Sequence, residues 1–185
     1  AIAHFRRMGE VWLVWPHETG LSPPEVDSAT IVERLEFYQS NPDTLSQLCS
    51  QLPDGFSMQA IDAQLLQRCA WREEMAFYAG SEENFLAHGV GLCMMQDDQI
   101  LVEAYASALG ETLAEIGAIT HESQRGRGYA PIACAFLAAA CQQRGCQPYW
   151  SCDADHTASI RVAQKMGFRQ AKAYQIYEYT QREQV

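Results

Sequence analysis

Short apolar runs alternate along the chain with segments of helical spacing, and turn-forming residues separate the two. The apolar runs are rich in β-branched and aromatic residues, which indicates strands. The strands that we expect span residues 10–15, 56–61, 90–95, 100–106, 112–120, 148–152 and 173–179. The polar tetrad at residues 96–99, Gln-Asp-Asp-Gln, predicts a hairpin between the third and fourth of these strands.

Other segments repeat their apolar positions every three to four residues, which is typical of amphipathic helices. In Ser28–Ser40, for example, Ile31, Val32 and Leu35 recur at this spacing. Asp62 is a typical N-cap for the helix expected over residues 62–70. The helices that we expect span residues 28–40, 44–52, 62–70, 72–78, 81–88, 130–144 and 159–166. This mixture predicts an α/β (α+β) protein, with an N-terminal α/β appendage at residues 1–54 and a core at 55–185.

Composition limits the partners of the chain. With 185 residues, 48% of them hydrophobic, the chain is long enough to bury a full core. A formal net charge of -10 argues against broad attraction to nucleic acid or anionic membrane. The seven cysteines contain no Cys-x-x-Cys pair, which favours a reducing compartment, and no apolar run approaches the length of a membrane span. We therefore expect a cytoplasmic protein with neither nucleic acid nor membrane as a partner.

The stretch Leu113–Pro131 joins an apolar strand to the longest small and apolar helical segment through a turn with Gly126 and Gly128. A helix start leaves about four N–H groups unpaired and carries partial positive charge, so it favours a phosphate-bearing ligand. A dinucleotide fingerprint fails because Pro131 follows where a third glycine is needed. A triphosphatase loop fails because Tyr129-Ala130 replaces its Lys and Ser or Thr.

Two motifs in order resemble a known family. Arg125-x-x-Gly128-x-Ala130 matches the Gln/Arg-x-x-Gly-x-Gly/Ala signature of the GCN5-related N-acetyltransferase (GNAT) superfamily. Asp155–Phe168 is similar to the family's second cofactor-side segment, Asn-x-x-Ser followed by Lys-x-Gly-Phe. The resemblance covers roughly residues 55–180, and residues 81–89 and 148–152 further resemble a bacterial branch that includes zwittermicin A-type resistance acetyltransferases.

The resemblance implies a mixed, mostly antiparallel sheet with helices on both faces and a splayed central strand pair. The thioester of acetyl-coenzyme A (acetyl-CoA) would enter this gap, its pyrophosphate held by main-chain amides of the turn and its pantetheine paired along the strand. The residues that the resemblance assigns to the cofactor are Ala118, Ile119, Thr120, Arg125, Gly126, Arg127, Gly128, Tyr129, Ala130, Pro131, Ser159 and Lys165.

Glu115 is the candidate general base. It stands on the strand ahead of the signature, where some family members place a catalytic glutamate, and a carboxylate lining the cleft can take a proton from an amine. The alternative is that Glu115 points outward or forms a structural pair. Glu103, on the preceding strand, is the rival base, although exposed strand glutamates are the commoner outcome.

The general acid departs from the family pattern. Many members carry a tyrosine seven residues after the motif asparagine, and here Ala163 and His156 occupy these two places. His156 is the candidate acid, because imidazole can donate a proton near neutral pH, and a solvent-exposed loop residue is its alternative interpretation. Tyr174, Tyr177 and Tyr179 are further candidates, although alternating tyrosines in a strand more often pack.

No His or Cys residues have metal-ligand spacing, so we expect no metal, and Cys152 is more typical of a buried thiol than of an acyl carrier. We expect acetyl transfer from acetyl-CoA to a primary amine of a small molecule, by direct attack in a ternary complex, since an acidic chain suits a cationic substrate. The alternatives are a catalytically silent acyl-CoA-binding module and an acetyltransferase for a protein amino group. The sequence leaves open whether the chain forms a homodimer.

Overall fold

The computed structural model describes residues 4–7, 10–15, 29–39, 41 and 43–180. Within them, nine strands form one sheet in the order β1-β2-β9-β3-β8-β7-β6-β5-β4. The strands are β1 (His4–Arg7), β2 (Glu10–Trp15), β3 (Ala29–Gln39), β4 (Phe56–Ala60), β5 (Gly91–Gln96), β6 (Gln99–Leu109), β7 (Leu113–Thr120), β8 (Gln147–Asp153) and β9 (Phe168–Thr180).

Neighbouring strands of this sheet are antiparallel, except for β7 and β8, which are parallel. These two strands pair over only three positions, from Leu113 opposite Gln147 to Glu115 opposite Tyr149. Beyond Glu115 they part, while β7 continues to pair with β6 as far as Thr120. The predicted mixed, mostly antiparallel sheet with a splayed central pair is therefore confirmed.

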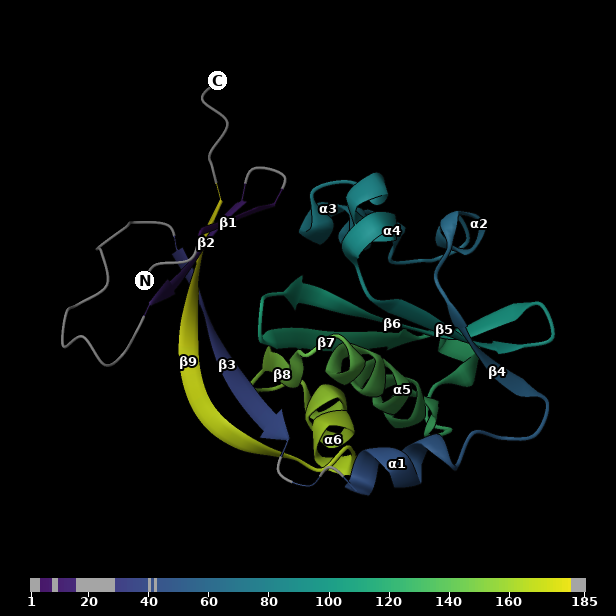
Figure 1. Cartoon of the computed structure of the whole chain (residues 1–185). Helices are drawn as coiled ribbons and strands as arrows, with labels where there is room; N and C mark the ends of the chain where they lie inside the picture. Colours follow the sequence, from purple (N-terminus) through teal and green to yellow (C-terminus); the bar gives the residue numbers. More distant parts are fainter. Residues whose placement is uncertain (1–3, 8–9, 16–28, 40, 42, 181–185) are drawn as a thin grey trace.

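Helices cover both faces of the sheet, as predicted (Figure 1). One face carries α1, α5 and α6, and the other carries α2, α3 and α4. The helices are α1 (Asp43–Cys49), α2 (Ala63–Leu66), α3 (Arg72–Ala79), α4 (Glu82–His88), α5 (Tyr129–Gln143) and α6 (Thr157–Lys165), with a short 3₁₀ turn, η2, at Glu122–Gln124. The described helices include none long and apolar enough to cross a membrane.

The core has two parts, one on each face of the sheet. The larger part packs the small and apolar side of α5, including Leu137 and Cys134, against Ile116 and its neighbours on β5 to β8. The smaller part lies under α2 to α4 and is centred on Met75, Phe85 and other buried side chains. Successive side chains of β7 therefore point alternately toward the face covered by α5 and the face covered by α3, because strand residues alternate faces.

Local signals define most helix ends. The carboxylate of Asp62 accepts the N–H of Leu65 at 2.8 Å, as expected of the predicted N-cap. Gly80 ends α3 in the left-handed conformation, with φ at 87°. The predicted helix over 62–70 is shorter than expected, because α2 ends at Leu66.

The helix predicted over residues 28–40 is wrong, because Ala29–Gln39 forms β3. This strand lies inside the sheet, paired with β9 on one side and β8 on the other. Its Ile31, Val32 and Phe37 are β-branched or aromatic residues that fit a pleated surface, and pairing on both sides overrides the apparent helical spacing. The described part of residues 1–54, expected as an appendage, therefore contributes strands to the same sheet as residues 55–180.

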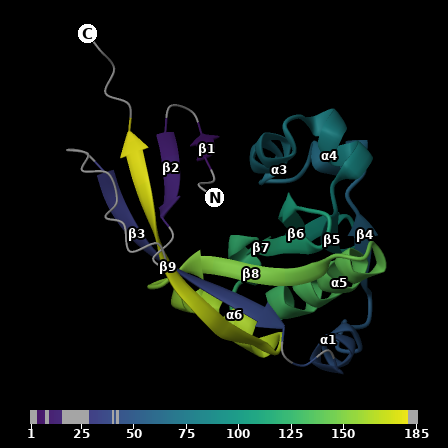
Figure 2. The ribbon, with the colours of Figure 1, turned by 60° about the vertical axis from the view of Figure 1, so that its left-hand side comes forward.

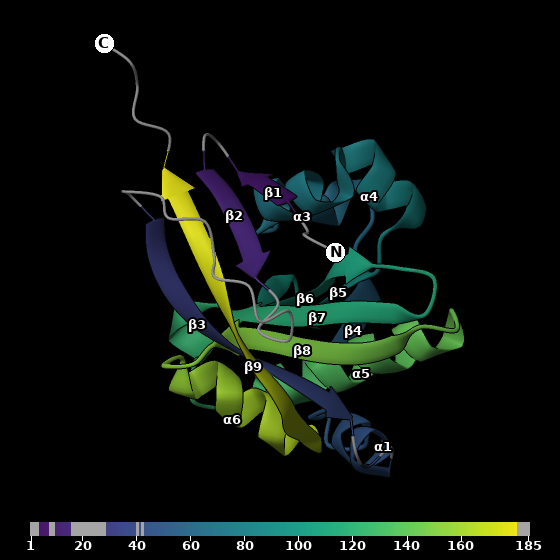
Figure 3. The same ribbon diagram turned by 90° about the vertical axis from the view of Figure 1, so that its left-hand side faces the viewer.

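The N-terminal hairpin extends the sheet beside its C-terminal strand. β2 pairs with β9, from Glu10 opposite Thr180 to Trp15 opposite Gln175, and β1 pairs with β2. Figures 2 and 3 show this hairpin rising on the same side of the central strands as α3 and α4. The hairpin and α3 thus stand on either side of the space above the parted strands β7 and β8.

Candidate active site

Two cavities lie where β7 and β8 part. The larger has a volume of about 700 Å³ and is bordered by the start of α5, the start of α6 and the end of β7. The smaller has a volume of about 110 Å³ and contains Glu115. Consecutive residues of β8 line different cavities, since Trp150 borders the larger one and Ser151 the smaller one. The parted strands therefore bring two sites on opposite faces of the sheet close together.

The turn before α5 forms one wall of the larger cavity. Gly126 and Gly128 have φ angles of 78° and 82°, a region that residues with a side chain rarely adopt. A Cβ atom at either glycine would meet no atom within 4 Å, so their backbone conformation, and not crowding, requires glycine. Gly128 caps α5 without a side-chain hydrogen bond, which leaves main-chain N–H groups available to an anion.

Of the residues predicted to hold a cofactor, Arg127 does not border the larger cavity. The others do, and they are Ala118, Ile119, Thr120, Arg125, Gly126, Gly128, Tyr129, Ala130, Pro131, Ser159 and Lys165. The prediction missed several residues of this cavity, namely Trp71, Gln124, Trp150, Ala158, Arg161 and Val162. Arg161 was recognisable in principle, because it lies four residues before Lys165 and so on the same face of α6.

Ser159 anchors an aromatic wall of the larger cavity. Its hydroxyl accepts a hydrogen bond from Trp150 Nε1 at 2.9 Å, which fixes the indole of β8 against the start of α6. Trp71, from the segment before α3, borders the same cavity and packs edge-on against Tyr105, with ring centroids 5.6 Å apart. The predicted serine thus holds the cavity wall through another side chain.

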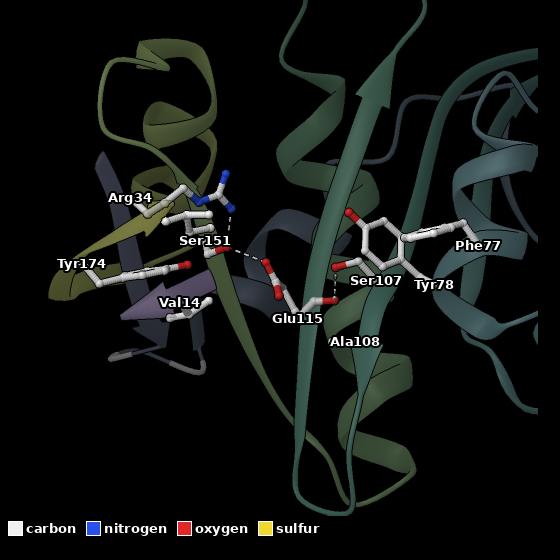
Figure 4. A pocket seen from close by; sticks show the side chains of 10 residues that line it. Val14, Arg34, Phe77, Tyr78, Ser107, Ala108, Glu115, Ser151 and Tyr174 are labelled. Carbon is white, nitrogen blue, oxygen red and sulfur yellow. Dashed lines mark hydrogen bonds between the residues drawn. The ribbon is translucent and has the colours of Figure 1, made fainter. Parts of the chain in front are cut away.

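Glu115 is the last residue of β7 that pairs with β8, and its half-buried carboxylate points into the smaller cavity (Figure 4). The hydroxyl of Tyr149 donates to Oε2 at 3.0 Å, and the hydroxyl of Ser151 donates to Oε1. Burial, together with the Glu115 charge and hydrogen bond, raises the pKa of Tyr149, so this phenol remains a donor near neutral pH. Two neighbours on β8 therefore orient the Glu115 carboxylate.

Arg34 of β3 extends this network. Its Nη2 donates to the Ser151 hydroxyl at 2.7 Å, and its Nη1 contacts Asp153 Oδ1 at 2.6 Å. Burial alone lowers the pKa of Arg34, but hydrogen bonds with Asp153 and Tyr174 outweigh it and raise the pKa overall. The guanidinium therefore stays charged and fixes the Ser151 hydroxyl, which must then direct its own proton to Glu115.

Glu103, the rival base, does not border either of these cavities. Its side chain is 0% exposed, and its two oxygens accept the N–H groups of Ala70 and Trp71 at 2.8 and 2.9 Å. His121 Nε2 lies 3.0 Å from Oε1 of the same carboxylate. This geometry is that of a structural anchor, which holds the segment between α2 and α3 against the sheet.

The candidate acids lie in different places. His156 borders the larger cavity with an exposed side chain, and Ala163, at the family's tyrosine position, is buried in the core. Tyr174 borders the smaller cavity, with its hydroxyl pointing toward Ser151 (Figure 4). Tyr177 instead donates to its neighbour Gln175 at 3.0 Å, and the side chain of Tyr179 lies outside the described residues.

Cys152 has the properties of a buried, protonated thiol. Burial raises the pKa of Cys152, and hydrogen bonds with Ser159 and Trp150 offset this only in part. A raised pKa keeps this thiol protonated and weakly nucleophilic at neutral pH. Among the described residues, no three His, Cys, Asp or Glu side chains cluster as a metal site requires.

Comparison with known proteins identifies the family to which the chain belongs. Residues 25–177 match the family model for GNAT acetyltransferases. The chain is 31% identical over 132 residues to the uncharacterized N-acetyltransferase YdfB of Bacillus subtilis, a match that covers 69% of this chain and 49% of YdfB. The chain thus spans about half the length of this curated relative.

Solved structures similar to this chain also include GNAT-type acetyltransferases. A GCN5-related N-acetyltransferase-like protein from Streptococcus suis superposes with a TM-score of 0.70 at 31% identity, covering 82% of this chain and 63% of that one. A putative GNAT-family acetyltransferase from Novosphingobium aromaticivorans, at 22% identity, superposes with a TM-score of 0.64 over 94% of this chain and 74% of its own, and so supports the fold. The zwittermicin A branch is not tested by these matches and stays a prediction.

Proposed function

The chain belongs to the GNAT acetyltransferase family, and we propose that it is an acyltransferase that moves the acetyl group of acetyl-CoA to a primary amine of a small molecule. The observation that carries this proposal is the position of Glu115. Its carboxylate points into the smaller cavity where β7 and β8 part, and the larger cavity with the glycine turn lies at the same parting of the strands.

The larger cavity fits coenzyme A. Its volume of about 700 Å³ lies within the usual range for ligand sites, about 300–1,000 Å³. Main-chain N–H groups at the start of α5 suit the pyrophosphate, and Arg125, Arg161 and Lys165 supply positive charge around the same cavity. On the side facing β8, residues 116–120 of β7 have no strand partner, so their main chain suits the pantetheine amides. His156 borders the cofactor in this arrangement.

When bound, acetyl-CoA supplies an acetyl group activated as a thioester. Glu115 accepts a proton from the acceptor amine, whose nitrogen then forms a bond to the acetyl carbon as the carbon–sulfur bond breaks. Tyr149 and Ser151 hold the carboxylate in line with the gap between the strands. The leaving thiolate takes a proton, and we assign its donor to the Tyr174 hydroxyl, which borders the smaller cavity and points toward Ser151. Direct transfer requires no acyl-cysteine, in keeping with the protonated Cys152.

A thiol-release assay tests this proposal. The purified protein is incubated with acetyl-CoA and a panel of primary amines, and each product is identified by mass. We expect amine-dependent release of coenzyme A and a product heavier by one acetyl group. Coenzyme A alone should also raise the melting temperature, because a ligand that binds only the folded state stabilises it.

The second candidate is a catalytically silent acyl-CoA-binding module. It is favoured by one observation, that the family's tyrosine and asparagine positions hold Ala163 and His156. Stabilisation by acetyl-CoA without turnover of small amines or peptide amino groups would establish the silent module. Turnover of peptides alone would instead establish a protein amino group as the acceptor.

A further inference from the structure

The smaller cavity has apolar walls and a polar floor. Its apolar lining comes from four elements, with Val14 on β2, Ala108 on β6, Ile176 on β9, and Phe77 and Tyr78 on α3. Figure 4 shows Val14 and Tyr174 on one side of Glu115 and the two α3 aromatics on the other. An acceptor whose nitrogen approaches Glu115 must therefore place the rest of its body between apolar and aromatic groups.

The floor of this cavity has little free charge to offer a second ionic group. Each terminal nitrogen of Arg34 already donates a hydrogen bond, Nη1 to Asp153 at 2.6 Å and Nη2 to Ser151 at 2.7 Å. Its Nε atom is buried without a partner and is not accessible to a ligand. Arg34 borders the cavity, but its charge is paired with the Asp153 carboxylate. Glu115 is left as the charge that faces the acceptor, and it favours one ammonium or amine group.

The size of the cavity points the same way. At about 110 Å³ it is smaller than the sites that enclose drug-sized ligands, so it takes the amine end of an acceptor and a few attached atoms. Additional ammonium groups of a polyamine would lie against Val14, Ile176 and the aromatic rings, where burial of an unpaired charge is unfavourable. A carboxylate next to the amine would lie close to Glu115 and be repelled.

The α3 aromatics give the acceptor body a contact surface. Phe77 and Tyr78 are 38% and 37% exposed, although both are large apolar side chains, and their rings pack edge-on with centroids 5.3 Å apart. Both border the cavity. Aromatic rings placed beside a site bind flat apolar groups by offset stacking or edge-on packing.

We propose that the acceptor is a monoamine with an apolar, preferably aromatic, body, of the arylalkylamine or alkylamine class, and without a carboxylate. The inference rests on the proposed function, because it assigns the acceptor of the same site. It names Phe77 and Tyr78 as the residues that determine specificity.

The test compares four amines that differ by one feature each. 2-Phenylethylamine is the reference, ethylamine lacks its ring, phenylalanine adds a carboxylate, and 1,5-diaminopentane replaces the ring by a second charge. We expect kcat/KM for 2-phenylethylamine to exceed each of the others by at least about tenfold, since burial of a ring contributes more than a factor of ten. A preference for phenylalanine or the diamine would overturn the proposal.

Variants locate the effect on α3. Phe77→Ala and Tyr78→Ala should each raise KM for 2-phenylethylamine about tenfold, and should raise KM for ethylamine by a smaller factor because ethylamine has no ring. Leu86→Ala is the matched control, because Leu86 is 39% exposed on the neighbouring helix and does not border the cavity. Equal KM values for the Phe77, Tyr78 and Leu86 variants would overturn the proposed role of α3.

Binding separates failure of this inference from failure of the proposed function. Calorimetry with the coenzyme A complex measures affinity for the same four amines without turnover. If 2-phenylethylamine binds most tightly but is never acetylated, the acceptor class stands and the acetyltransferase proposal fails. If 2-phenylethylamine neither binds preferentially nor reacts, the inference fails.

Discussion

Replacement of Glu103 by Gln separates a structural carboxylate from a catalytic one. Glu103 is fully buried and accepts three hydrogen bonds, from the N–H groups of Ala70 and Trp71 and from His121. A glutamine keeps the size of the side chain, but only its oxygen can accept, so its NH₂ group must face a main-chain N–H. One partly buried main-chain donor then has no acceptor.

The expected loss follows from these contacts. A hydrogen bond to a charged group contributes about 1.5–3 kcal/mol, and a donor left unpaired in the interior costs about as much again. Allowing for relaxation of the 70–71 segment, the variant should lose roughly 3 kcal/mol of unfolding free energy. For a chain of 150–250 residues this corresponds to a fall in Tm on the order of 6–12 °C.

Differential scanning calorimetry and kinetics with saturating acetyl-CoA measure the two roles separately. Glu111→Gln is the control, since it removes the same charge from an exposed turn. We expect Glu103→Gln to lower Tm, with kcat within about threefold of the unmodified protein, a small effect on the free-energy scale of catalysis. A variant with normal Tm whose kcat falls a hundredfold or more would refute the structural role.

Three further predictions concern the smaller cavity and its surroundings. Ser151→Ala should lower kcat/KM about 10- to 100-fold, because it removes the hydroxyl that donates to the Glu115 carboxylate. Ser151→Thr is the control, because it keeps the hydroxyl. Equal activity of the two variants would count against an orienting role for Ser151. Cys152→Ser should keep most of the activity, and intact-mass measurement should find no acetyl-enzyme, because burial raises the pKa of this thiol. Between pH about 10 and about 12 the Tm should fall, because two tyrosines ionise at higher pH in the folded state than in the unfolded state. Hydrogen bonding to Glu36 raises the pKa of Tyr38 to about 12, and burial raises the pKa of Tyr149. In the unfolded chain both tyrosines ionise near pH 10. Their stabilisation is therefore complete below pH 10 and lost above it, and Tyr149→Phe should flatten the fall; an unchanged slope would contradict this assignment.

The strands and helices around the signature could be predicted because their signals are local. Asp62 caps a helix as expected, and Ser81, where a helix was expected to begin, caps the next one but one; each accepts an N–H three residues ahead. Gly126 and Gly128 adopt left-handed conformations that fit the turn predicted from the motif. Such features depend on a few adjacent residues, so the sequence alone contains them.

The rest depends on pairing between distant segments. Residues 29–39 match helical spacing, but their structure is decided by β8 and β9, more than a hundred residues away. The contact of Arg34 with Ser151 therefore could not be predicted once Arg34 had been assigned to a helix. The contact of Glu103 on β6 with the N–H groups of residues 70 and 71 likewise joins segments more than thirty residues apart.

The central claim is that Glu115 accepts the amine proton in acetyl transfer, and one variant tests it most directly. Glu115→Gln keeps the shape of the side chain and can still accept from Tyr149 or Ser151, but it cannot take a proton. Coenzyme A release with acetyl-CoA and the best amine is measured beside the rise in Tm that coenzyme A produces. We predict that kcat/KM falls about 10²- to 10⁴-fold, the usual contribution of a general base, with the rise in Tm unchanged. A Glu115→Gln variant that releases coenzyme A at the unmodified rate would contradict the account.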